Sequence, residues 1–123
     1  MTANEEIFKV ERVDHADNII KVILSINADS PIFNGHFPGQ PVIPGACMLQ
    51  VVKDVLAGSL GYGVQLKNGD NLKFVGMIVP DAASAVTLEI SYKVIDNSIS
   101  VNAKLSEGDR VCFKLQGTFL NLD

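Results

Sequence analysis

The chain has 123 residues, of which 47% are hydrophobic and 20% are charged, and its formal net charge at pH 7 is −4. This length and composition predict one globular domain, residues 1–123, with a single core. The acidic balance disfavours nucleic acid as a partner, because phosphate binding needs a basic face. The sequence has no signal-peptide pattern and no apolar run long enough to cross a bilayer, so we expect a cytoplasmic location and no membrane partner.

The first part of the chain predicts two strands. Residues 7–13 form a short apolar run, and the polar residues 14–18 predict a turn that places His15 at the surface. Residues 20–26 alternate apolar and polar side chains, which is typical of a half-buried strand.

The segment 31–45 predicts a stiff, irregular loop. It contains four of the five prolines and three glycines. Proline fixes φ and pushes the preceding residue toward extended conformations, whereas glycine permits backbone angles that a side chain forbids. The loop should therefore fix the direction of His36, one of only two histidines.

Residues 46–57 predict a helix of about three turns. The segment is apolar nearly all round, which indicates burial. Gln50, Lys53 and Asp54 are the exceptions, and their spacing places them on one polar stripe. The start of the helix should offer free backbone N–H groups, and the glycine-rich segment 58–63 should end it.

The remaining chain predicts a meander of antiparallel strands, with turns at 96–97 and 107–109. Together with the first two strands and the helix, this order indicates an α+β fold in which one helix packs against one sheet. Cys47 and Cys112 lack metal-ligand spacing, so we expect buried reduced thiols and no metal site. The predicted strands of this half are 71–79, 86–93, 98–105 and 111–119.

The run His36-Phe37-Pro38-Gly39-x-Pro41-x-x-Pro44-Gly45 resembles the hot-dog-fold 3-hydroxyacyl-[acyl-carrier-protein] dehydratases. The resemblance implies a curled antiparallel sheet wrapped around one long buried helix. It also implies a homodimer, the double hot-dog, whose subunits join edge to edge with active sites between them. The implied reaction converts a 3-hydroxyacyl thioester on acyl carrier protein to a trans-2-enoyl thioester, in fatty-acid or related lipid or polyene synthesis. It needs no cofactor and no metal.

The resemblance also implies roles for individual residues. His36 would be the base, which suits an imidazole whose unperturbed pKa is about 6.5. The Gly45 amide would hold the thioester carbonyl at the helix start, with Pro44 and Ala46 beside it in the substrate site. Two other possibilities stay open. In the first, His36 has no catalytic role and only supports the loop. In the second, the nearby aromatic rings, which could line an acyl tunnel, only pack against the loop. Those rings belong to Phe33 and Phe37.

This sequence departs from the family at the acid. The family places Glu or Asp five residues after the glycine, and here that position is Gln50. An amide has no acidic proton to donate at neutral pH. Asp54, one turn further on, would supply or relay the proton while Gln50 holds it. Alternatively Asp54 pairs only with Lys53 or solvent, and the site has lost full dehydratase activity.

Two other functions remain open. In the first, the chain is a non-catalytic or half-catalytic subunit that forms a heterodimer with a related dehydratase. In the second, the chain is an acyl thioesterase. The intact loop motif favours dehydration over hydrolysis, because hydrolysis needs a positioned water. An acidic carrier protein would also prefer a local basic patch, and the sequence alone does not place one.

Overall fold

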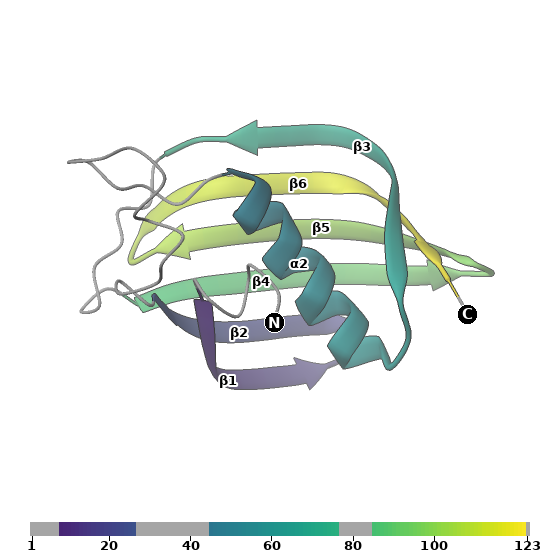
Figure 1. The fold of residues 1–123 in the computed structure, drawn as a ribbon, viewed down its shortest axis with the longest axis horizontal. Coiled ribbons are helices and arrows are strands. Elements are labelled where there is room, and N and C mark those ends of the chain that lie inside the picture. The colour runs from purple at the N-terminus through teal and green to yellow at the C-terminus, as the bar shows by residue number, and fades with distance from the viewer. Residues whose placement is uncertain (1–7, 27–44, 77–84, 123) are drawn as a thin grey trace.

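The computed structural model describes residues 8–26, 45–76 and 85–122 (Figure 1). They form a six-stranded antiparallel sheet with strand order β1-β2-β4-β5-β6-β3 and one helix, α2. Four of the predicted site residues lie outside the described residues: Phe33, His36, Phe37 and Pro44. The elements are β1 (Phe8–Ala16), β2 (Ile19–Ile26), α2 (Gly45–Leu60), β3 (Val64–Phe74), β4 (Ala85–Ile95), β5 (Ser98–Glu107) and β6 (Arg110–Asn121).

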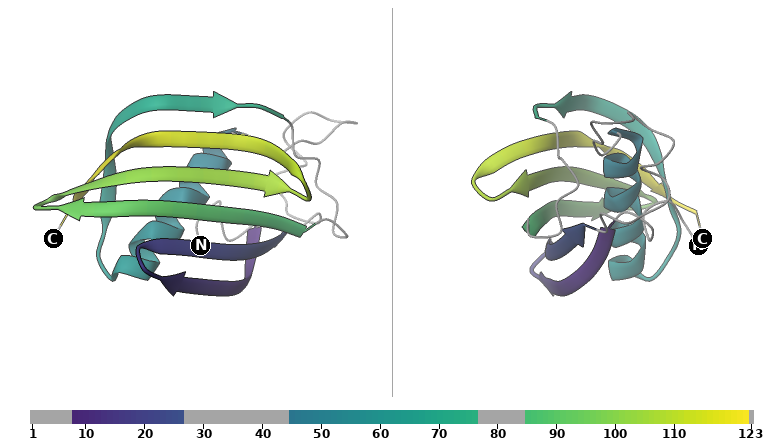
Figure 2. Two further views of the ribbon diagram at one scale, coloured as in Figure 1. Left: turned by 180° about the vertical axis from the view of Figure 1, so that it is seen from behind. Right: turned by 60° about the vertical axis from the view of Figure 1, so that its left-hand side comes forward.

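The sheet curls around α2, which lies against its concave face (Figures 1 and 2). Alternate residues of each inner strand are buried, as in Ile20, Val22 and Leu24 of β2. The strands bury these residues against the apolar face of α2, which contributes Met48, Val51, Val52 and Leu56. This confirms the predicted α+β hot-dog arrangement. Within the described part of the chain, no helix is long and apolar enough to cross a bilayer.

Residues with positive φ lie in the turns of two hairpins. Asp17 and Asn18 have φ values of 53° and 64°, and Asp96 has 55°. Asp and Asn adopt positive φ more readily than most residues, and two such residues in sequence suit a two-residue hairpin. At the end of α2, Gly61 has φ 84° and its N–H donates to the Ala57 carbonyl at 2.9 Å. This left-handed residue ends the helix, as the glycine-rich segment predicted.

Two predictions of strand position were wrong. β1 continues to Ala16, so His15 lies in a strand and only Asp17 and Asn18 form the turn. β3 begins at Val64 rather than at residue 71 and ends at Phe74. Its polar run, residues 67–71, is held by pairing with β6 across two register shifts, a tertiary contact that no local pattern reports.

The order of strands after the helix also differs from a simple meander. β4, β5 and β6 are consecutive neighbours, but β3 pairs with β6 and occupies the edge of the sheet. The chain must therefore cross from β3 at one edge to β4 in the middle of the sheet. Cys112 is buried and free as predicted, and the side chain of Cys47 lies outside the described residues.

Candidate functional site

Helix α2 begins at Gly45, the glycine that ends the sequence motif. Its first turn has backbone N–H groups without intrahelical partners and the positive end of the helix dipole. Such a terminus suits an oxygen that gains negative charge during a reaction. The backbone of Gly45 and Ala46 belongs to this first turn, while the side chain of Ala46 lies outside the described residues.

The side chains of Gln50 and Asp54 form one hydrogen-bonded unit, two turns into α2. Gln50 Nε2 donates to Asp54 Oδ1 at 2.8 Å, and the pair is partly buried. No ion pair links Asp54 to Lys53, although the structure describes both residues. Within the predicted polar stripe, the contact that forms is therefore the one between the Gln50 amide and the Asp54 carboxylate.

The second carboxylate oxygen of Asp54 is left without a partner. Oδ2 is buried and has no hydrogen-bond partner among the described residues. A buried acceptor without a donor costs about 1–3 kcal/mol, so such an atom calls for an explanation. A ligand that brings an O–H or N–H group to Oδ2 would satisfy it.

Two hollows flank α2, and the Gln50–Asp54 pair lies between them. Asp54 lines a mostly apolar hollow of about 360 Å³ between α2 and β1. Gln50 lines another, of about 370 Å³, between α2 and strands β3 and β6. The two residues of the hydrogen-bonded pair thus line different hollows. The first hollow is lined by Val10, Val13, His15, Asp54, Val55, Gly58 and Ser59, and the second by Leu49, Gln50, Lys53, Gln65, Leu66 and Phe119.

His15 is a residue of this region that the sequence reasoning missed. It is exposed, as predicted, but it lines the same hollow as Asp54. Its Nε2 lies 2.6 Å from Tyr92 Oη, a hydrogen bond whose donor depends on the histidine tautomer, and the ring centroids are 5.7 Å apart. The sequence could have indicated this position of His15 through its two-residue spacing from Val13, because residues at that spacing lie on the same face of a strand.

The chemistry of the described residues is that of acid, amide and backbone N–H groups. Among these residues, no three His, Cys, Asp or Glu side chains gather in a way that could hold a metal ion. Asp54 can accept a hydrogen bond or carry a proton, Gln50 fixes its orientation, and the start of α2 can stabilise an oxyanion.

A curled antiparallel sheet wrapped around one helix defines the hot-dog class of proteins. Residues 12–114 match the ApeI-like family, described as ApeI dehydratase. The chain therefore belongs to the ApeI-like dehydratase family.

Individual relatives agree with this assignment. The chain is 34% identical over 79 residues to the 3-hydroxyacyl-[acyl-carrier-protein] dehydratase FabZ of Syntrophomonas wolfei, a match that covers 56% of the chain and spans only about half (53%) of that relative. It is 27% identical to FabZ of Streptococcus mutans, over 89% of the chain and 87% of the relative. The dehydratase heterocomplex ApeI:P from Xenorhabdus doucetiae has the same fold, with TM-score 0.76 and 18% identity over 93% of this chain and 98% of that one.

Proposed function

We propose that this protein dehydrates a 3-hydroxyacyl thioester, carried on acyl carrier protein, to the trans-2-enoyl thioester. Membership of a dehydratase family supports the reaction class. The observation that carries the proposal is the Gln50–Asp54 hydrogen bond, which leaves Asp54 Oδ2 buried and unpartnered. This places a carboxyl group on the helix of a chain that has an amide at the family's acid position.

In the proposed reaction, His36 removes the proton α to the thioester carbonyl and becomes an imidazolium. The Gly45 N–H stabilises the enolate oxygen at the start of α2. Protonated Asp54 then donates from Oδ2 to the leaving 3-hydroxyl group, so the Cβ–O bond breaks and water departs. Asp54 ends as a carboxylate, and transfer of the proton from His36 to Asp54 restores both groups. Phe33, Phe37, Pro44 and Ala46 would line the substrate site.

We also propose that the active unit is at least a homodimer joined through β3. This strand is at the end of the sheet order, and a sheet edge offers unpaired N–H and C=O groups. Large apolar side chains are exposed at its end, where Phe74 is 53% and Val75 is 59% accessible. A second copy would cover both features, and the pair would work in the cytoplasm.

Steady-state turnover of a short 3-hydroxyacyl thioester and of its enoyl product tests the function. We expect His36→Ala and Asp54→Asn each to lower kcat at least about 100-fold, the ordinary scale for removing a general base or acid. Lys53→Met, on the same helix beside Asp54, should stay within twofold of wild type. If only His36→Ala loses activity, the acid is another group. Release of free thiol without enoyl product would show a thioesterase instead.

A second candidate is a half-catalytic subunit that completes its site with a related dehydratase. The amide at position 50 favours it, because the family's acid is absent there. The similar fold of a dehydratase described as a heterocomplex also favours it. In this case the purified chain is inert, and turnover appears only when the related subunit is added.

A further inference from the structure

A row of charged side chains crosses the whole sheet, one residue from each strand. Each member is the register partner of the next, so neighbours in the row lie directly opposite one another on paired strands. The first three members alternate in sign, but the last three are all lysines. In order from β1, the row is Asp14, Lys21, Glu89, Lys104, Lys114 and Lys73.

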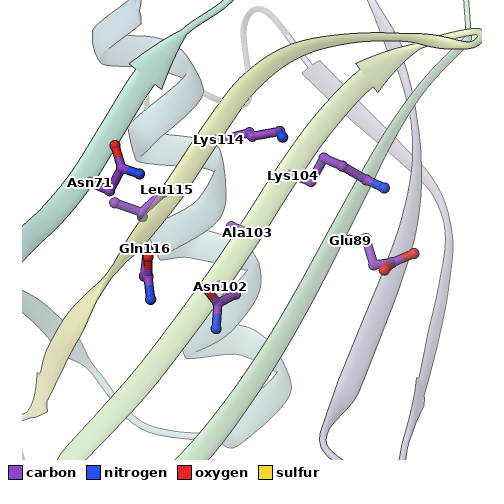
Figure 3. A pocket seen from close by; sticks show the side chains of 8 residues that line it. All are labelled: Asn71, Glu89, Asn102, Ala103, Lys104, Lys114, Leu115 and Gln116. Atoms are coloured by element: carbon purple, nitrogen blue, oxygen red, sulfur yellow. The ribbon is translucent and has the colours of Figure 1, made fainter.

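The row lies on the sheet face turned away from α2. In Figure 3, the side chains of Glu89, Lys104 and Lys114 project from this face while α2 lies behind the strands. The adjacent residues Ala103 and Leu115 point the other way and are buried. Lys73 pairs with Lys114, so the alternation of strands places it on the same outer face.

The three lysines, which we call the lysine row, have no acidic partner in the described part of the chain. Lys73, Lys104 and Lys114 are exposed, and none forms an ion pair with another described residue. Glu89, which is opposite Lys104, has a carboxylate oxygen 4.0 Å from Lys21 Nζ instead. Like charges directly opposite on neighbouring strands are destabilising. The fold itself therefore gains nothing from placing three positive charges side by side on a chain of net charge −4.

Two of the three lysines, Lys104 and Lys114, line a shallow hollow of about 270 Å³, and Lys73 lies outside its lining. A second row runs beside it, in which Asn71, Gln116 and Asn102 are register partners on β3, β6 and β5. Their amides can donate and accept hydrogen bonds. This face of the sheet thus offers three lysines and three amides on β5, β6 and β3, with the carboxylate of Glu89 beside them on β4. Such a surface suits the binding of carboxylates.

We infer that the lysine row is a docking surface for an acidic helix of a partner protein. Neighbouring strands are about 4.7–4.9 Å apart, so the backbone positions of the three lysines repeat at nearly this interval. Carboxylates on successive turns of a helix repeat at about 5.4 Å, close enough for the flexible lysine side chains to match. Glu89 closes the row at β4 and would repel a fourth carboxylate, which fixes where the helix ends.

Charge favours a local acidic helix over an extended polyanion. Duplex DNA carries a negative charge about every 1.7 Å and binds long basic faces, whereas this row spans only three strands. Anionic membranes are recognised by clusters of about 4–8 basic residues. The identity of the partner as acyl carrier protein rests on the proposed function, but the recognition of an acidic helix does not.

The test is a binding measurement with two probes and two triple variants. One probe is the acyl carrier protein of the same organism, and the other is an alanine-rich helical peptide with Glu on three successive turns. The patch variant is Lys73→Glu, Lys104→Glu and Lys114→Glu. The control is Lys9→Glu, Lys67→Glu and Lys93→Glu, which makes the same change in net charge at exposed lysines outside the row. Calorimetry or NMR titration gives Kd at several salt concentrations.

We expect the patch variant to weaken binding of both probes at least about tenfold, and the control to stay within about twofold. Wild-type affinity should fall steeply as salt rises. Equal loss in both triple variants, or no loss in either, would overturn the inference. So would failure of both probes to bind while phosphatidylserine vesicles bind through the same lysines. If probe binding depends on the row but turnover of a free thioester is absent, the proposed function fails and the docking surface stands. If turnover is present but carrier binding ignores the row, the docking surface fails alone.

Discussion

Gln50 and Asp54 are one turn apart on α2, and the amide Nε2 of Gln50 donates to the carboxylate Oδ1 of Asp54 at 2.8 Å. The amide thereby uses one oxygen of the acid and leaves the other buried and unpartnered. An acid oriented in this way has one oxygen held and one available for a proton. The pair therefore acts as a unit, and a change at either residue should be felt at the other.

Replacing Gln50 with Glu should make stability depend on pH. Two carboxylates within hydrogen-bond distance share a proton, which raises the apparent pKa of the pair above that of the unfolded chain. Because the pKa of the pair is higher in the folded state, raising the pH above the pKa of the unfolded chain destabilises the folded state. The variant therefore approaches wild-type stability near pH 4–5 and loses stability at higher pH. At pH 8 we expect a loss of about 1–3 kcal/mol in the free energy of unfolding.

Urea denaturation of Gln50→Glu at pH 5 and pH 8 measures this change. Ser100→Glu is the control, because it adds the same charge at an exposed position of β5. A difference from wild type that is the same at both pH values would show that the two carboxylates do not interact.

The sequence predicted the local features of the fold and missed those that depend on distant contacts. Alternation in segments such as 98–105 gave the central strands, and the Asp-Asn turns were visible because these residues tolerate positive φ. The alternation that starts β3 at Val64 and Leu66 is broken by the polar run 67–71, and the pairing of this run with β6 across two register shifts was not predictable from the segment itself.

The site was predictable in the same uneven way. The i, i+4 spacing gave the contact between Gln50 and Asp54, because helical neighbours at that interval share a face. The hollow that brings His15 near Asp54 was not predictable, since it depends on how β1 packs beside α2. The lysine row needed the strand register, because Lys73, Lys104 and Lys114 are far apart in sequence.

Tyr92→Phe should loosen the side of the hollow that contains His15. The substitution removes the hydroxyl that lies 2.6 Å from His15 Nε2, and we expect a loss of about 0.5–1 kcal/mol because the pair is exposed. The imidazole ¹⁵N shifts of His15 should move with it in NMR spectra. Tyr62→Phe is the control, since the Tyr62 hydroxyl forms no hydrogen bond with any residue that the structure describes. Unchanged His15 shifts in Tyr92→Phe would show that the hydrogen bond does not form in solution.

Gly117→Ala should destabilise the pairing of β3 and β6. A Cβ at this position would collide with the backbone carbonyl oxygen of Asn68, at the first register shift of β3. Backbone cannot move aside as a flexible side chain would, so we expect a loss of about 1–3 kcal/mol. The register partner Gly69 is a matched control, because a Cβ there would meet open space. Equal denaturation midpoints for Gly117→Ala and Gly69→Ala would contradict the strand register.

Phe74→Glu should weaken self-association through the β3 edge. Phe74 is 53% exposed in the single chain, although its ring packs on buried Phe113 at a centroid distance of 5.1 Å. If a second copy covers this edge, a carboxylate there would be buried without a partner, which is strongly unfavourable. Sedimentation velocity should then show at least about a tenfold rise in the dimer dissociation constant. Val94→Glu is the control, because Val94 is similarly exposed (46%) but lies on β4, three strands away from β3 in the sheet order. If the dimer survives Phe74→Glu but dissociates in Val94→Glu, the contact lies near the C-terminal end of β4. This outcome would contradict the β3 interface.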